Sequence, residues 1–312
     1  MMIAFHEIRE FSPAVNAYAA GLAKLHDLEL AGRFESQEAE AVRDEMDLPW
    51  RYLNAREHNL VDKLAASLNR LLEPKSGRPD TVAASLIDSL LEKLSKCDLN
   101  TILDDIDNLD SQLPEAMGAC LRGLSWREWN VPEAALPFFR FAYSKRPDSQ
   151  SYLLQLISAL LATHRFAEGQ EIASQNVQRN LRPEVRLKLA EAIIADALER
   201  DEADHSLLLQ AKQVATDALT ALEQDENAEP EIAAAGYFFL ALCYLVLGDE
   251  AAAKEACREA IRIDPTSVDA LAMWGQFNSE DISTGDRKAF QRGRISEILA
   301  RTTDGPANYT YN

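Results

Sequence analysis

Proline and glycine are scarce in this chain, with 12 of each among 312 residues. Both residues interrupt helices, so their scarcity, together with abundant alanine, leucine and glutamate, favours a helical protein. The hydrophobic fraction of 47% is large enough for a buried core, which argues against extensive disorder. The length allows one large domain or two smaller ones.

Basic residues are few relative to acidic ones. The chain has 32 Lys and Arg against 51 Asp and Glu, which gives a formal net charge of −19. A surface this acidic repels phosphate backbones and anionic lipid headgroups, so we expect neither a nucleic acid nor a membrane as the partner. The negative charge serves solubility, and it can also attract a basic partner protein.

Cysteine is rare as well, with four residues and no C-x-x-C pair, and the five histidines are scattered. These counts predict no zinc site and indicate a reducing compartment. The N-terminal residues lack the basic segment and apolar core of a signal peptide, so we expect a cytoplasmic protein. Cys243 and Cys257 are expected to be buried structural thiols rather than a redox pair.

Enzyme motifs are missing. The sequence contains no G-x-x-x-x-G-K-[ST] phosphate loop, no H-E-x-x-H zinc motif and no G-x-S-x-G nucleophile elbow. The acidic run at 104–110 (DDIDNLD) lacks the central glycine and the closing glutamate of a calcium loop, and we interpret it as a solvated helix face. We therefore predict a protein that is not an enzyme and that carries no cofactor and no metal.

A hydrophobic run long enough to cross a bilayer is also not evident. The apolar run from Ile232 to Leu247 has 16 residues, fewer than the ~20 that a membrane-spanning helix needs. It stops at Gly248-Asp249, a typical turn pair. We predict that this run is a helix surrounded by neighbouring helices and not a membrane span.

Six prolines recur at a nearly regular distance: Pro79, Pro114, Pro147, Pro183, Pro230 and Pro265. The successive gaps are 35, 33, 36, 47 and 35 residues. Each interval has the pattern of two amphipathic helices separated by a short polar break, and proline begins or ends helices. A proline about every 34 residues with a helix pair between is typical of a helical-repeat solenoid.

The interval that ends at Pro265 has the clearest pattern. Its first helix carries aromatic residues and an aliphatic–small pair, its turn is Gly-Asp, and its second helix carries small residues: Tyr237, Leu240-Ala241, Tyr244, Gly248-Asp249, Ala253 and Ala260. This pattern resembles the tetratricopeptide repeat (TPR) family, with Cys257 in place of an aromatic residue. The resemblance implies helical hairpins whose small residues let the helices approach closely.

The resemblance covers about residues 79–278. The interval 116–147 keeps several family positions at the expected spacings, namely Gly123, Trp126, Ala135, Phe139, Ala142 and Pro147. Pro137 departs from the pattern and should kink the second helix of that interval. The interval 184–230 is longer than the others. The interval 79–113 has the expected length but few of the family's typical residues, and residues 268–277 begin a final helix. The implied fold is all-α, a right-handed TPR-type solenoid.

Two segments flank the repeats. Residues 1–78 are predicted to form about three helices, over 13–30, 35–47 and 55–72, that continue the row of repeats; a separate cap is the alternative. Ser12-Pro13 is a typical helix start. Residues 279–312 are predicted to hold a helix at 285–301 with a local net charge of +3, followed by a tail. That helix either docks on the acidic protein itself or contacts a partner.

In the TPR family, the first helix of each hairpin lines a concave surface where ligands bind. The resemblance carries this role to seven apolar residues: Met117, Leu124, Leu154, Leu161, Phe238, Leu242 and Leu245. Some family members clamp a terminal carboxylate with cationic and amide side chains at such positions, and this chain has almost none of them there. The resemblance thus implies an apolar groove for an amphipathic helix or an extended peptide. The alternative is that neighbouring helices of the protein itself cover these apolar residues.

The predicted function is a non-catalytic protein–protein interaction module, either an adaptor or a chaperone-like protein. The alternative is a regulatory or structural subunit of a larger bacterial assembly, such as a secretion or defence complex, that contacts its partners through its acidic face and its ends. The bacterial source is suggested because the stretch at 43–47 (RDEMD) is similar to segments beside repeats in bacterial proteins. Fold alone does not name the process.

Overall fold

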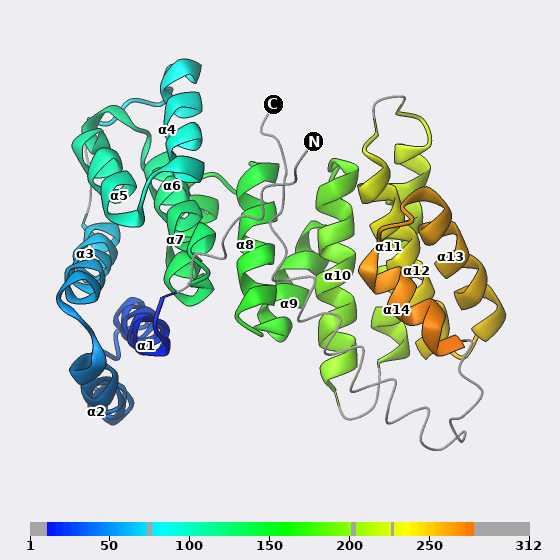
Figure 1. Ribbon diagram of the computed structural model, residues 1–312, viewed down its shortest axis with the longest axis horizontal. Helices are drawn as coiled ribbons and strands as arrows, with labels where there is room; N and C mark the ends of the chain where they lie inside the picture. Colours follow the sequence, from blue (N-terminus) through cyan, green and yellow to red (C-terminus); the bar gives the residue numbers. More distant parts are fainter. Residues whose placement is uncertain (1–10, 74–76, 201–203, 226–227, 278–312) are drawn as a thin grey trace. The chain divides into compact units, whose positions relative to one another are not determined.

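The computed structural model describes residues 11–73, 77–200, 204–225 and 228–277. Over these ranges the backbone forms fourteen α-helices and one short 3-10 helix, and it contains no strand (Figure 1). The predicted all-α class is thereby confirmed. The predicted helix at 285–301 lies outside the described residues.

Internal contacts divide the chain into two units, Met1–Ala159 and Leu160–Asn312. The first unit contains α1 (Pro13–Leu30), α2 (Gln37–Tyr52), α3 (Ala55–Leu72), α4 (Ala84–Lys96), α5 (Leu99–Asn108), η1 (Asp110–Gln112), α6 (Glu115–Glu128) and α7 (Pro132–Lys145). The division falls inside α8 (Gln150–Ala162). The second unit contains α9 (Phe166–Asn176), α10 (Pro183–Glu199), α11 (His205–Leu222), α12 (Pro230–Val246), α13 (Glu250–Ile263) and α14 (Val268–Phe277). The predicted domain borders after residues 78 and 278 stay predictions.

Prolines and short polar side chains determine where many helices begin. Four helices start with a proline, whose missing N–H costs no hydrogen bond at that position: Pro13, Pro132, Pro183 and Pro230. After α12 the backbone turns at Gly248, which has a φ of +88°. The side chain of Asp249 then caps α13 by accepting a hydrogen bond of 3.1 Å from the N–H of Ala252. The predicted break at Gly248-Asp249 is confirmed.

In the first unit, α6 and α7 form a tightly packed pair. Trp126 of α6 and Phe138 and Phe139 of α7 have no exposed surface. At Gly123 the two helices approach so closely that an added Cβ would lie 2.7 Å from the Phe139 ring. The spacing of this pair therefore requires a residue without a side chain at position 123.

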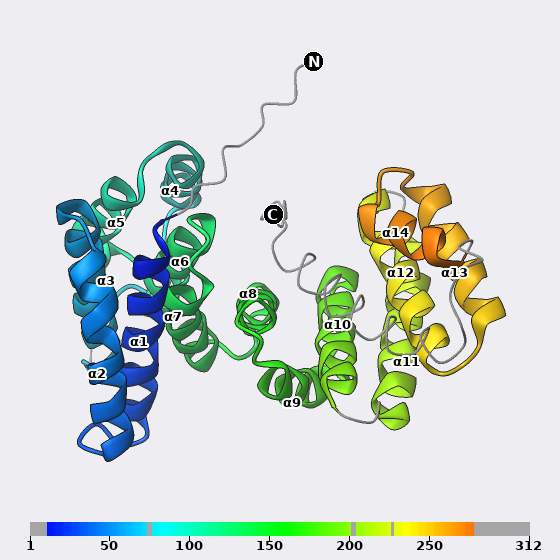
Figure 2. The same cartoon turned by 60° about the horizontal axis from the view of Figure 1, so that its bottom comes forward.

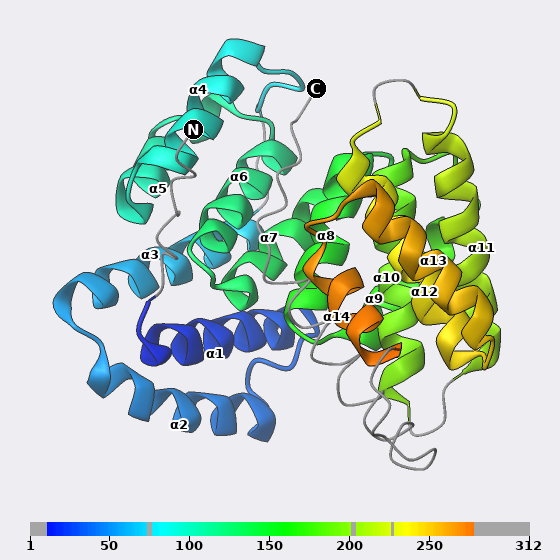
Figure 3. The ribbon, with the colours of Figure 1, turned by 45° about the vertical axis from the view of Figure 1, so that its right-hand side comes forward.

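The N-terminal helices fold back onto α7. Both α1 and α3 pack against α7, and α1 lies between α2 and α7 (Figure 3). Arg140 of α7 donates hydrogen bonds of 2.8 and 2.9 Å to the carboxylate of Asp27 in α1, which lies 113 residues away in the sequence. Phe11 stacks on Trp129 with 4.9 Å between ring centroids. In this segment α1 pairs with a helix that is distant in the sequence, and whether the segment continues the row of repeats or forms a separate cap stays a prediction.

In the second unit, each helix from α9 to α14 packs against the next. In addition α10 contacts α12, and Figure 2 shows α10, α11 and α12 side by side. Gly236 of α12 permits this close arrangement, since an added Cβ would lie 2.8 Å from Leu219 and 3.2 Å from Leu187. Among the described helices, α12 included, none combines the length and apolarity that crossing a membrane demands.

The contact at Gly123 makes a testable prediction. We expect Gly123→Ala to lower the free energy of unfolding by ~1–2 kcal/mol, because the clash with Phe139 outweighs the better helix propensity of alanine. Gly169→Ala is the matched control, since this buried helical glycine has only ordinary contacts, 3.7 Å to Ala192 and 3.8 Å to Leu160. Urea titration of both variants, followed by circular dichroism, measures the difference. Equal stability changes would contradict the steric explanation.

Candidate functional site

The seven residues predicted to line a groove are mostly buried. Exposed fractions are 4% for Leu124, 4% for Leu154, 2% for Leu161, 2% for Phe238 and 0% for Leu242, whereas Met117 and Leu245 are partly exposed. Buried side chains can reach a ligand only if the surrounding helices rearrange. Their place in a binding groove stays a prediction, and in the described structure five of them are core residues.

The apolar run of α12 shows why these side chains are covered. Phe238 lies beside Phe239, with ring centroids 6.0 Å apart, and both are buried. Helices α10, α11 and α13 all pack against α12. Leu240 and Ala241 are buried as the sequence indicated. The run from Ile232 to Leu247 is thus covered largely within its own unit, by helices that the repeat pattern places next to it.

Exposed large apolar side chains gather in one part of the first unit. Eight are exposed among the described residues, and five of them fall between residues 30 and 52: Leu30, Phe34, Leu48, Trp50 and Tyr52. Leu48, Trp50 and Tyr52 belong to the last turns of α2, with exposed fractions of 61%, 38% and 72%. We call these three residues, with Asp44, Glu45 and Asp47 on the same helix, the α2 surface. An exposed cluster of this kind commonly marks an interaction site.

Trp50 is held in place by rings from two other helices. Its centroid lies 4.1 Å from that of His58 in α3, in an edge-to-face arrangement, and 5.2 Å from that of Tyr18 in α1. Aromatic pairs at such distances are attractive. The indole therefore combines a fixed position with substantial exposure, a combination found in aromatic residues that anchor protein contacts.

The carboxylates of the α2 surface have no ion-pair partner among the described residues. At the start of α2 the situation differs, because Glu38 pairs with Arg33 at 3.0 Å and Glu40 with Arg43 at 3.2 Å. Asp44, Glu45 and Asp47 are exposed, and α2 contains two cations, Arg43, which pairs with Glu40, and Arg51 in the last turn. The end of α2 therefore carries negative charge next to its apolar residues.

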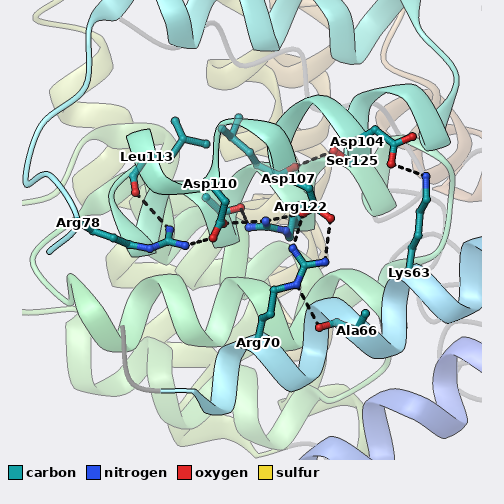
Figure 4. A network of polar contacts seen from close by, with 12 residues as sticks. Lys63, Ala66, Arg70, Arg78, Asp104, Asp107, Asp110, Leu113, Arg122 and Ser125 are labelled. Carbon is teal, nitrogen blue, oxygen red and sulfur yellow. Dashed lines mark hydrogen bonds and ion pairs between the residues drawn. The ribbon is translucent and has the colours of Figure 1, made fainter. Parts of the chain in front are cut away.

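A network of arginines and aspartates connects α3 to α6 (Figure 4). Arg122 of α6 is only 4% exposed, and it donates hydrogen bonds of 2.7 Å to Asp107 and 2.8 Å to Asp110. Arg70 of α3 donates a 2.8 Å hydrogen bond to Asp107, and Arg78 donates to Asp110. A buried guanidinium needs such partners, because an uncompensated charge is costly in the protein interior.

The acidic run at 104–110 therefore joins helices in addition to facing solvent: Asp104 is exposed as expected, whereas Asp107 and Asp110 are only partly exposed. Asp104 pairs with Lys63 of α3 at 2.6 Å, and Asp105 pairs with Lys93 of α4 at 2.6 Å. Burial alone would raise the pKa of Asp107, but hydrogen bonds from Arg70 and Arg122 outweigh it and hold that pKa below its ordinary value. Each of these aspartates accepts a hydrogen bond from a cationic side chain, which suits a structural role better than proton transfer.

The buried cysteines are unreactive in the described structure. Burial raises the pKa of Cys120 and Cys243 to about 12 and that of Cys257 to about 11, so all three remain thiols at neutral pH. The expectation that Cys243 and Cys257 are buried thiols is confirmed. Within the ranges described, no group of three or more His, Cys, Asp or Glu side chains is arranged to hold a metal ion.

Comparison with known proteins yields no relative. No protein-family model matches the chain, and neither the curated proteins nor the solved structures contain a significant match. The likeness to the TPR family therefore depends on the sequence pattern alone.

Sequence reasoning did not single out the α2 surface. Leu48, Trp50 and Tyr52 stand in the stretch DLPWRY at the end of α2, and their exposure depends on which side of α2 faces α1. The buried residues of α2 are Ala39, Val42 and Met46. Their spacing predicts the buried face, and the apolar residues that fall outside it were the available signal.

The arginine network predicts a pH-dependent stability. Asp107→Asn should lower the free energy of unfolding at neutral pH by ~1–3 kcal/mol, because it weakens hydrogen bonds to two charged arginines. The native pKa of Asp107 is depressed, so the stabilisation is complete above the ordinary value of 3.8 and is lost as the pH falls through the lower native value.

Urea titrations between about pH 7 and pH 3 measure this effect. The difference in free energy of unfolding between the natural protein and Asp107→Asn should shrink toward the acidic end of this range. Asp104→Asn is the control, because its exposed pair with Lys63 contributes ~1 kcal/mol or less. A difference in free energy of unfolding that stays constant over the whole pH range would rule out the charge of Asp107 as its cause.

Proposed function

We propose that this protein is a non-catalytic protein-interaction module that binds a helix or an extended peptide of another protein, and that the α2 surface makes the contact. The observation that carries the proposal is the concentration of exposed aliphatic and aromatic side chains between residues 30 and 52. Tryptophan and tyrosine are over-represented among the residues that dominate binding energy at protein interfaces. Leu48 and Tyr52 lie four residues apart on α2, so they form one apolar pair on its outer side.

The proposal includes a TPR-type arrangement of hairpins within each unit. It is supported by the tight pairs α6–α7, α10–α11 and α12–α13, each formed by helices adjacent in sequence. Small residues stand at the close contacts, as at Gly123 and Gly236. In this family the concave groove is the usual binding surface, but in this chain the burial of Phe238 and Leu242 makes the α2 surface the better-supported contact.

A second candidate is a regulatory or structural subunit of a larger assembly. The carboxylates of Asp44, Glu45 and Asp47, which have no ion-pair partner among the described residues, favour it, because an acidic face suits a permanent contact with a basic subunit. A permanent subunit would co-purify at fixed stoichiometry, whereas an adaptor would exchange its partners.

The proposed contact is tested with the double variant Leu48→Asp, Tyr52→Asp. Both side chains are exposed, so the fold should persist while the apolar pair is lost. We expect the recovery of partner proteins from lysate of the native cells, quantified by mass spectrometry, to fall at least about tenfold. Leu209→Asp is the matched control, since Leu209 is 51% exposed on α11 in the second unit. Unchanged recovery with an intact helical spectrum would refute the assignment of this surface.

A further inference from the structure

The α2 surface adjoins a second group of side chains that comes from three helices. Asp47 and Trp50 are three residues apart on α2, and His58 and Asp62 are four residues apart on α3, so each pair lies on one face of its helix. Trp50 contacts both His58 and Tyr18. Three aromatic rings and two carboxylates are thus brought together where α1, α2 and α3 meet.

The two carboxylates belong to the same neighbourhood as the rings. Burial raises the pKa of Tyr18, and the charges of Asp62 and Asp47 raise it further. Neither Asp47 nor Asp62 has an ion-pair partner among the described residues, and both are exposed. Two unneutralised negative charges next to an exposed indole provide both of the features that attract an organic cation, a ring face and a counter-charge.

We propose that this junction, formed by Tyr18, Trp50 and His58 with Asp47 and Asp62, binds a lysine or arginine side chain of a basic amphipathic helix from a partner protein. The inference rests on the proposed function and specifies the chemistry of the partner. The cation lies against the Trp50 ring between the two carboxylates, and the apolar side of the helix covers Leu48 and Tyr52. Asp44 and Glu45, one turn before Leu48, receive further basic residues.

Charge complementarity favours a basic amphipathic helix over a second copy of the chain and over a purely apolar peptide. A second copy of the chain would bring another surface of a protein with net charge −19, which repels the carboxylates of α2. A purely apolar peptide would leave Asp44, Glu45 and Asp47 next to a low-dielectric surface without partners, which costs free energy. A basic amphipathic helix satisfies the charges and covers the apolar residues at the same time.

The test uses a defined probe and the full-length protein. The probe is a fluorescent helical peptide of about 18 residues with leucines at i, i+3, i+4 and i+7 and lysines on the other side. A second peptide carries glutamate in place of every lysine. Fluorescence anisotropy at an ionic strength of about 0.15 M gives the dissociation constants. We expect the lysine peptide to bind and the glutamate peptide to bind at least about tenfold more weakly.

Two pairs of substitutions with the same charge change separate a built site from general attraction. Asp47→Asn, Asp62→Asn should weaken binding of the lysine peptide at least about tenfold. The double variant Glu171→Gln, Glu199→Gln removes two exposed carboxylates in the second unit. It should change the dissociation constant of the lysine peptide less than about twofold. Trp50→Ala should weaken binding as the aspartate pair does. The conservative aspartate pair keeps the test valid if Trp50→Ala disturbs the fold.

Three results would overturn the inference. Equal weakening by the two charge pairs would mean that net charge alone attracts the peptide. Equal binding of the glutamate peptide would mean that the apolar pair is sufficient. A dimer in light scattering that disappears in Leu48→Asp, Tyr52→Asp would identify a second copy as the occupant. If native partners still depend on Leu48 and Tyr52 in any of these cases, the proposed function stands and only the basic chemistry of the partner is wrong.

Discussion

The ion pairs of Arg122 determine how the first unit is assembled. A guanidinium that is 4% exposed must have carboxylate partners, and both come from the short stretch that contains the end of α5 and η1. Asp107 also accepts from Arg70, which ties α3 to the same centre. The position of α3 in turn fixes His58, and His58 supports Trp50. A buried charge on α6 is therefore connected, through α5 and α3, to the exposed aromatic residue of α2.

Local signals in the sequence predicted where helices begin and turn. Pro183 and Pro230 start α10 and α12, and Gly248-Asp249 separates α12 from α13, because these residues act through the backbone of their own segment. The all-α class followed from the same signals. Such features need no knowledge of the neighbouring helices, which explains why one sequence is enough to find them.

The features that periodicity within a single helix could not establish all depend on which side of a helix meets a neighbour. Phe238 and Leu242 were expected to face a ligand, and that role stays a prediction; in the structure α12 is packed against three helices and both side chains are buried. Asp107 was expected to face solvent, but Arg122 lies on the adjacent helix. The return of α1 to α7 joins Asp27 to Arg140 over 113 residues, and no periodicity within either helix encodes that pairing. The α2 surface escaped notice for the same reason.

Few residues of α2 are buried, and this has a consequence for the dynamics of the helix. Only Ala39, Val42 and Met46 are buried on this helix, and its main packing partner is α1. Segments with few buried apolar contacts open at a low free-energy cost, so the amide hydrogens of α2 should exchange with solvent sooner than those of α6 or α10. A ligand that binds only the closed helix slows this opening by mass action. Occupancy of the α2 surface and the folding of α2 are therefore thermodynamically coupled, and each can be observed through the other.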